Sequence, residues 1–180
     1  MSDFNTIQQI KRNFFSFRNG VIADSLKKGG SPYRLIFGLN LPQLNQIAQN
    51  IGEDLATAKQ LHDDVNTRES QLLSSLIMPV DKIQQAEEAF NWLEGLRSKE
   101  AIDIACHKLI KKTSNPLLVT EMCVSTENSL LRYAGIRLLW NIYMTLPEES
   151  RSLALRAKAL DKENERLIDN LIEEIDFIIG

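Results

Sequence analysis

The dominant pattern in this chain is helical, because apolar residues recur every three or four positions along most of its length. In the first segment Phe4, Ile7, Ile10 and Phe14 keep this spacing, which places them on one face of a helix over about residues 2–17. Gly20 interrupts the pattern, and a second short helical segment ends at the loop Gly29–Pro32. The pattern therefore predicts two short helices at the start of the chain.

The next segment, Tyr33–Gly38, is short and apolar and has the composition of a strand. The chain offers it no partner strand, so we expect a buried connector or turn. A helix is predicted over residues 40–50, because Pro42 stands in its first turn and Gly52 comes just after its end.

Pro79, Pro116 and Pro147 punctuate the remaining chain at intervals of 37 and 31 residues, and each interval holds two helices. Ser98 and Ser125 are candidate N-caps within these intervals. We expect four helix pairs: 54–63 with 67–78, 82–96 with 99–112, 117–124 with 126–145, and 148–160 with 162–177. The near-constant period favours an all-α fold, an α-solenoid of HEAT-like antiparallel helix pairs in one domain over residues 1–180, over an up-down bundle.

Composition agrees with an ordinary globular protein, at 43% hydrophobic and 25% charged residues. The two cysteines, Cys106 and Cys123, lack a CxxC spacing and are expected to be reduced core residues. The first five residues have neither a basic nor an apolar signal region, and no apolar run is long enough to span a membrane. We therefore expect a cytoplasmic protein without a membrane partner.

The net charge of −3 is unevenly distributed. Residues 1–145 carry 16 Lys and Arg against 15 Asp and Glu, whereas residues 146–180 carry 5 against 9. A protein with this charge distribution is expected to bind DNA only if its positive charge is concentrated on one face. The acidic segment 146–180 is not expected to belong to that face.

Sequence motifs for a catalytic triad, a phosphate-binding loop or a zinc protease are absent, and we expect neither a cofactor nor a metal. Lys99, Asp103, His107 and Lys111 lie four residues apart and share one face of a predicted helix. On periodicity alone this is a solvated stripe with weak ion pairs.

A second helix, around residues 130–140, is apolar nearly all round but contains Arg132. A buried arginine needs an anionic partner, so Arg132 either forms a structural salt bridge or reaches a groove where it meets phosphate. Trp92 and Trp140 are more typical of core anchors than of platforms for base stacking.

Several of these segments, taken in order over residues 26–140, resemble the AlkD-like DNA alkylation repair family, which has a HEAT-like fold. The resemblance rests on Phe37–Pro42 and the helix after it, on the stretch 60–72, on Trp92 followed by Asp103, and on Leu131–Ala134.

This resemblance implies excision of alkylated purines from DNA by hydrolysis of the N-glycosidic bond. Asp103 would be the catalytic carboxylate that stabilises an oxocarbenium-like sugar and orients water. Arg132 would hold the backbone phosphate, and Trp92 would belong to the substrate pocket. Further DNA contacts would come from Lys99, Lys108, Lys111 and Lys112.

Two departures from the family favour a second hypothesis. Lys99 stands where the family has a Trp, and a cation there would repel a cationic base and weaken the field of Asp103. The acidic pair over 148–177 contains no Trp or Tyr. The alternative is a non-catalytic HEAT-repeat scaffold that binds protein or DNA through its concave face.

The predicted last helix carries a strong apolar stripe, formed by Leu167, Ile168, Leu171, Ile172, Ile175, Ile178 and Ile179. We expect this stripe to pack inward on the preceding helix pair. If part of it were exposed, it would provide a surface for a homodimer.

Overall fold

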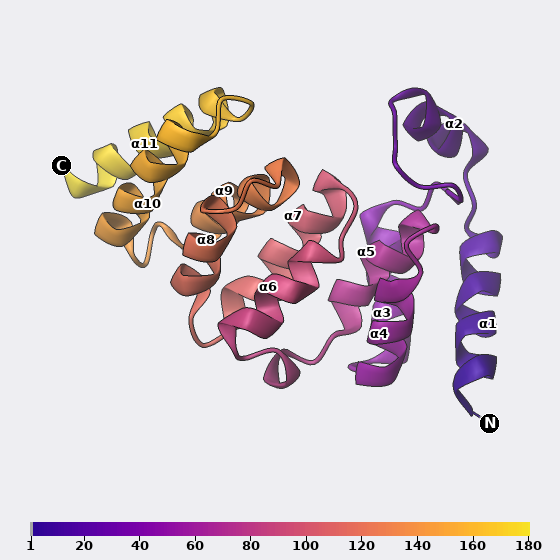
Figure 1. The fold of residues 1–180 in the computed structure, drawn as a ribbon. Helices are drawn as coiled ribbons and strands as arrows, with labels where there is room; N and C mark the ends of the chain where they lie inside the picture. The colour runs from indigo at the N-terminus through magenta and orange to yellow at the C-terminus, as the bar shows by residue number, and fades with distance from the viewer. Residues whose placement is uncertain (1) are drawn as a thin grey trace. The chain divides into compact units, whose positions relative to one another are not determined.

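The computed structural model describes residues 2–180 and is all-α, with adjacent helices packed in the manner of helical-repeat proteins (Figure 1). This confirms the predicted fold class. The helices are α1 Ser2–Ser16, α2 Gly20–Lys28, α3 Leu41–Ile51, α4 Leu55–Asp63, α5 Arg68–Ile77, α6 Ala86–Glu94, α7 Lys99–Lys108, α8 Pro116–Val124, α9 Ser129–Ile142, α10 Pro147–Leu160 and α11 Glu165–Ile179. Two short 3₁₀ turns, Val80–Lys82 and Ile110–Lys112, lie between them.

The helices group into two compact units, which we describe separately. The first unit contains the chain up to Lys82 together with Gly95–Ile104, and the second contains Ile83–Glu94 and Ala105–Gly180. Helix α7 therefore begins in the first unit and ends in the second. The assignment of one domain to the whole chain stays a prediction.

In the first unit, α4 and α5 form a helical hairpin, α3 packs on α5, and α1 packs on α4. Helix α3 begins and ends as its sequence predicts. Asn40 and Gln43 form a reciprocal capping box at its start, and Gly52 ends it with a positive φ of 76°. Local signals thus set the limits of this helix.

The segment before α3 is a connector, as expected, but it is only partly buried: Tyr33, Ile36 and Gly38 are buried, whereas Arg34 and Leu35 are exposed. Leu35 forms a one-residue parallel bridge with Thr67, in which the Leu35 amide donates to the Asn66 carbonyl at 2.9 Å and the Arg68 amide donates to the Leu35 carbonyl at 3.0 Å. The connector therefore takes its partner from the turn before α5.

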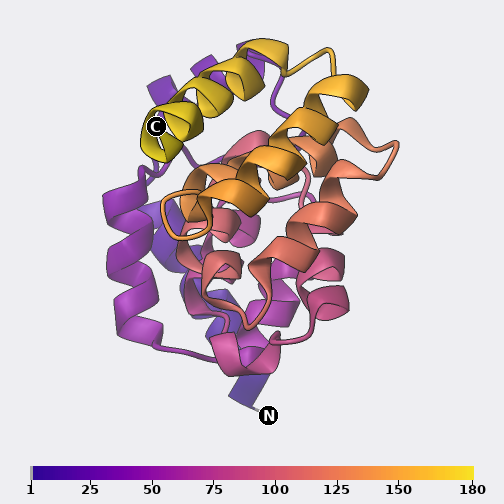
Figure 2. The same ribbon diagram turned by 90° about the vertical axis from the view of Figure 1, so that its left-hand side faces the viewer.

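In the second unit, α8 pairs with α9, α10 pairs with α11, and α6 packs against α8 and α9. Figure 2 shows α10 and α11 side by side at the C-terminal end of the chain. Two apolar clusters join these helices: one contains Val124, Ile136, Ala157 and Ile168, and the other contains Leu139, Ala154, Leu171 and Ile175. The predicted hairpins 117–145 and 148–177 are thus present, with slightly different limits.

One predicted cap is confirmed and the other is wrong. The Ser98 hydroxyl accepts a hydrogen bond from the Ala101 amide at 3.1 Å, as expected for the N-cap of α7. Ser125 instead lies at the C-terminal end of α8, where its hydroxyl donates to the Glu121 carbonyl. Asn128 caps α9, because its side chain accepts from the first amides of that helix. The turn before α9 is longer than expected, so the cap falls three residues later.

Both cysteines are buried free thiols, as predicted. Burial raises the pKa of the Cys123 thiol to about 12, which keeps it protonated and unreactive. Among residues 2–180, no helix is long and apolar enough to cross a membrane.

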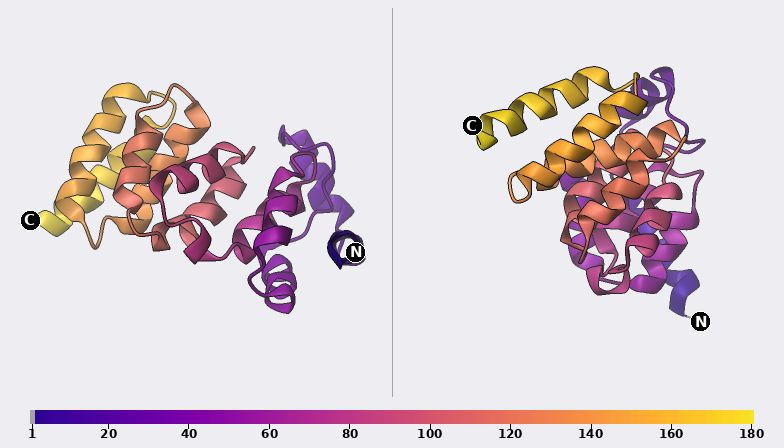
Figure 3. Two further views of the ribbon diagram at one scale, coloured as in Figure 1. Left: turned by 60° about the horizontal axis from the view of Figure 1, so that its bottom comes forward. Right: turned by 60° about the vertical axis from the view of Figure 1, so that its left-hand side comes forward.

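The apolar stripe of α11 packs inward along most of its length, as expected. Ile168, Leu171 and Ile175 are fully buried against α9 and α10, which lie beside α11 in both views of Figure 3. Only the end of the helix exposes apolar side chains, and Phe177 is 87% exposed. Dimerisation through this end stays a prediction.

Candidate functional site

The predicted catalytic carboxylate, Asp103, lies on the part of α7 that belongs to the first unit. Its side chain is half-buried, and Lys99 is exposed one helical turn before it. The structure therefore places the carboxylate and the cation on one stretch of helix, as the sequence predicts.

Arg132 of α9 is held inside the second unit by three contacts. Its Nη1 donates to the carbonyl oxygens of Thr126 at 3.2 Å and Glu127 at 2.8 Å, and its Nε lies 3.6 Å from Oδ2 of the buried Asp161. Its side chain is only 17% exposed. These contacts are those of a structural salt bridge, and a phosphate ligand would have to compete with them.

Asp161 also holds the loop between α10 and α11. Its Oδ1 accepts from the Glu163 amide at 3.0 Å and from the Asn164 amide at 3.3 Å, and its Oδ2 accepts from the Asn164 side chain at 2.7 Å. Arg132 thus balances the charge of a carboxylate that mainly stabilises the loop of the α10–α11 hairpin.

The remaining predicted site residues lie in the second unit. Trp92 is a core residue at 7% exposure, Lys108 and Lys111 are half-buried, and Lys112 is exposed. Lys111 Nζ lies 3.3 Å from Nδ1 of His107. The predicted set is therefore divided between the two units, and its action as one site stays a prediction.

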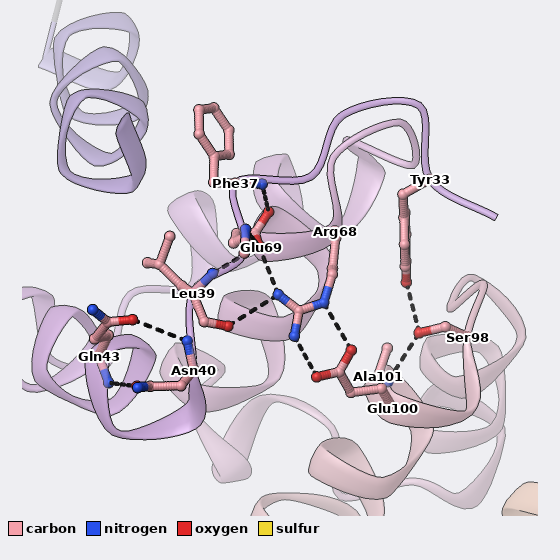
Figure 4. Close-up of polar contacts among 11 residues, drawn as sticks. Tyr33, Phe37, Leu39, Asn40, Gln43, Arg68, Glu69, Ser98, Glu100 and Ala101 are labelled. Carbon is pink, nitrogen blue, oxygen red and sulfur yellow. Dashed lines mark hydrogen bonds and ion pairs between the residues drawn. The ribbon is translucent and has the colours of Figure 1, made fainter. Parts of the chain in front are cut away.

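The most developed polar network lies in the first unit, around the start of α5 (Figure 4). The buried Glu69 carboxylate accepts three backbone amides from the connector: Phe37 at 3.0 Å, Gly38 at 2.9 Å and Leu39 at 3.3 Å. Gly38 has a φ of +82°, and a Cβ there would lie 2.2 Å from the Asn19 carbonyl oxygen. A nest of consecutive amides therefore holds an internal anion, and it requires glycine at its centre.

Arg68 balances this anion. Its Nη1 donates to Glu69 at 2.6 Å and to the Leu39 carbonyl at 3.0 Å. Its Nε and Nη2 form a bidentate pair with the Glu100 carboxylate, with Nε at 2.8 Å. Arg68 of α5 thereby links the connector to Glu100 at the start of α7 (Figure 4).

Gln71, one turn further along α5, completes the network. Its Oε1 accepts from the Tyr33 hydroxyl at 2.9 Å and from the Arg97 amide at 3.0 Å, and its Nε2 donates to the His62 and Gly95 carbonyls. Burial is the main cause that raises the pKa of the Tyr33 hydroxyl, which remains a donor. Sequence reasoning missed this network; its signals are the adjacent Arg68 and Glu69 and the glycine of the connector.

Next to this network the first unit has a hollow of about 650 Å³. We call it the aromatic hollow; it is lined by Gln8, Lys11, Arg12, Phe15, Ser16 and Phe37. The Phe37 ring points away from the polar contacts in Figure 4 and packs on Phe14 at a centroid distance of 5.7 Å. Phe15 is 58% exposed, and the Arg18 guanidinium lies over its ring at 3.9 Å from the centroid.

The first fifty residues of the chain, which supply the lining of the aromatic hollow, are basic in sequence. Residues 1–50 carry six Lys and Arg against two Asp, a net charge of +4. Lys11 also pairs with Asp64 at 2.9 Å. Partial burial raises the pKa of the Asp64 carboxyl, but hydrogen bonds from Lys11 and Ser70 outweigh this effect and leave the pKa below its usual value.

Over the described residues, no three His, Cys, Asp or Glu side chains gather as they would around a metal ion. Comparison of the chain with models of protein families, with curated proteins and with solved structures gives no match.

Proposed function

We propose that this chain is a DNA-binding helical-repeat protein that acts in the manner of DNA alkylation repair proteins, and that its first unit makes the principal DNA contact. The observation that carries the proposal is the aromatic hollow, where an exposed phenylalanine lies among cations in a segment of net charge +4. The resemblance of residues 26–140 to the AlkD-like family supplies the repair context.

Charge and stacking both contribute to the proposed DNA binding. Lysine and arginine neutralise phosphates and release counterions, which is the main source of affinity for DNA in general. An exposed aromatic ring adds a surface on which bases stack. Arg12 and Arg18 flank Phe15 on α1 and the turn after it, so both kinds of contact are within one short stretch.

A titration of labelled DNA over a range of salt concentrations tests the proposal. The double variant Arg12→Gln/Arg18→Gln should bind more weakly, and its salt slope should fall by about one for each phosphate that is no longer neutralised. The matched control Lys162→Gln/Arg166→Gln makes the same change of charge on exposed residues at the acidic C-terminal pair. Equal effects of the two double variants would reject the first unit as the binding surface.

A second candidate function is excision of alkylated purines, favoured by the half-buried Asp103 carboxylate on α7. Lys99 one turn earlier and the contacts of Arg132 with Asp161 favour binding without catalysis. Release of methylated bases from alkylated DNA, measured for the wild type and for Asp103→Ala, decides between them. Release by the wild type alone would establish a glycosylase. Saturable binding without release would support the non-catalytic protein.

A further inference from the structure

We propose that the aromatic hollow holds an unpaired nucleobase, so that the chain binds single-stranded DNA in preference to intact duplex. This inference rests on the proposed DNA binding and names the form of DNA that the first unit recognises. It follows from the lining of the hollow, from the way its walls are held, and from comparison with two other hollows of similar size.

The lining combines the groups that an unpaired nucleotide needs. Phe15 exposes more than half of its surface; the Arg18 guanidinium lies over one face of its ring, so a base would stack on the other face or displace Arg18. Gln8 provides a donor and an acceptor for the edge of a base, and the Ser16 hydroxyl, which donates to the Arg12 carbonyl at 3.0 Å, can accept. Arg12 supplies positive charge for phosphate, whereas Lys11 is already paired with Asp64 at 2.9 Å. No carboxylate belongs to this lining, as far as residues 6–180 are concerned.

One wall of the hollow is held rigidly before any ligand arrives. The Phe37 amide is bonded to the buried Glu69 carboxylate, and the Phe37 ring is half-buried against Phe14. Bases within duplex DNA are already paired and stacked, so their faces are not accessible to a side chain. A pre-organised apolar wall beside an exposed aromatic ring therefore favours a base that is free of its partner.

The other hollows lack this combination. A groove of about 630 Å³ between α1 and α3 is lined by Thr6, Gln9, Ile10, Asn13, Ile47, Asn50, Ile51 and Asp54. Among residues 6–180, whose side chains the structure describes, this lining contains no cation and no aromatic ring. A hollow of about 530 Å³ between α8 and α10 contains Glu121 and Glu149, and its one cation, Arg156, is paired with Glu121 at 2.8 Å. Carboxylates at these places would repel the DNA backbone. Charge complementarity thus selects the aromatic hollow.

The test compares the binding of a labelled oligothymidylate with that of the same strand paired to oligoadenylate, by fluorescence anisotropy at one salt concentration. The wild type should bind the single strand about tenfold more tightly, which corresponds to about 1.4 kcal/mol. Phe15→Ala should lose most of this preference while its affinity for the duplex changes little. Circular dichroism checks that this exposed position tolerates the change.

Phe17→Ala is the matched control, since Phe17 is an exposed aromatic residue nearby that does not line the hollow. It should retain the preference for the single strand. Equal binding of both DNA forms by the wild type, or equal losses in Phe15→Ala and Phe17→Ala, would overturn the inference and leave the DNA-binding function standing. Absence of binding to both forms would overturn the function and the inference together.

Discussion

Arg68 in the first unit and Arg132 in the second both reach a buried carboxylate from within a helix, but the two networks differ in completeness. Arg68 donates through all three of its side-chain nitrogens, and its partner Glu69 accepts three amides of the connector. Arg132 keeps its Nε 3.6 Å from Asp161, without a hydrogen bond.

The difference in hydrogen bonding between the Glu69 and Asp161 networks matches the segments that they stabilise. The Asp161 network closes a hairpin between neighbouring helices, and a looser ion pair is sufficient there. The Glu69 network fixes an irregular segment whose far side forms a wall of the aromatic hollow, and such a segment has no helix to define its backbone. A site placed on a connector needs a fully bonded support, which is what the first unit provides.

The largest expected effect on stability comes from neutralising Glu69, the buried carboxylate of the network in the first unit. Glu69→Gln removes one of the two carboxylates that balance Arg68, so that only Glu100 opposes its buried charge, and it turns an amide donor toward backbone amides. We expect it to lower the free energy of unfolding by about 3–5 kcal/mol, as measured by urea denaturation. Glu53→Gln, which changes an exposed carboxylate of the same unit, is the control and should shift stability by less than about 0.5 kcal/mol. Similar small shifts in both variants would show that the network is dispensable.

The next effect is expected at the glycine of the connector. Gly38 and Gly30 both have a φ of +82°, but a Cβ meets the Asn19 carbonyl at 2.2 Å only at Gly38. Gly30→Ala should therefore cost about 1 kcal/mol for the left-handed backbone alone. Gly38→Ala should cost at least about 1 kcal/mol more, because backbone must shift, and should also weaken the preference for single-stranded DNA. Equal thermal stabilities for the two variants would contradict the close approach seen in the structure.

A smaller effect on stability is expected for the Arg132–Asp161 ion pair of the second unit. Asp161→Asn retains the acceptor oxygen for the Glu163 and Asn164 amides before α11 but removes the charge opposite Arg132. The expected loss is about 1–2 kcal/mol by thermal or urea unfolding. Asp176→Asn, which removes an exposed partner of Arg151, serves as the control and should have almost no effect. A loss as large as that of Glu69→Gln would mean that the two networks are equally important.

The smallest effect concerns pH. The folded-state pKa of Asp64 lies below its unfolded value, so its contribution to stability is present above an unfolded pKa of about 3.9 and is lost as the pH falls through the lower folded value. Asp64→Asn should lower the free energy of unfolding at neutral pH. In acid, the free energies of unfolding of the variant and the wild type should become more similar. A difference between the two proteins that does not change from neutral to acid pH would contradict the pairing with Lys11.

Much of the helical framework could be predicted, because its signals are local. Pro42 and Gly52 indicated the limits of α3, and Pro116 and Pro147 marked the starts of the hairpins α8–α9 and α10–α11. The wrong cap at Ser125 also has a local origin, since Ser125 and Asn128 are both good N-cap residues and only the length of the turn distinguishes them.

The candidate site was less predictable, because its contacts join distant residues. Glu69 finds its amides about thirty residues earlier in the chain, and Arg132 finds Asp161 about as far ahead. Periodicity predicts that a polar residue lies in a helix, but not which loop will bond it. Helical periodicity places Phe15 off the apolar stripe that contains Phe14, but it does not show that Phe37 lies beside Phe15.

The most direct test of the DNA-binding account is photocrosslinking of a single strand containing 5-iododeoxyuridine, followed by mass spectrometry of the digested protein. The account predicts crosslinks within residues 8–18 or at Phe37, and their reduction in Phe15→Ala. Crosslinks confined to α10 and α11, or none under conditions of saturating binding, would contradict it.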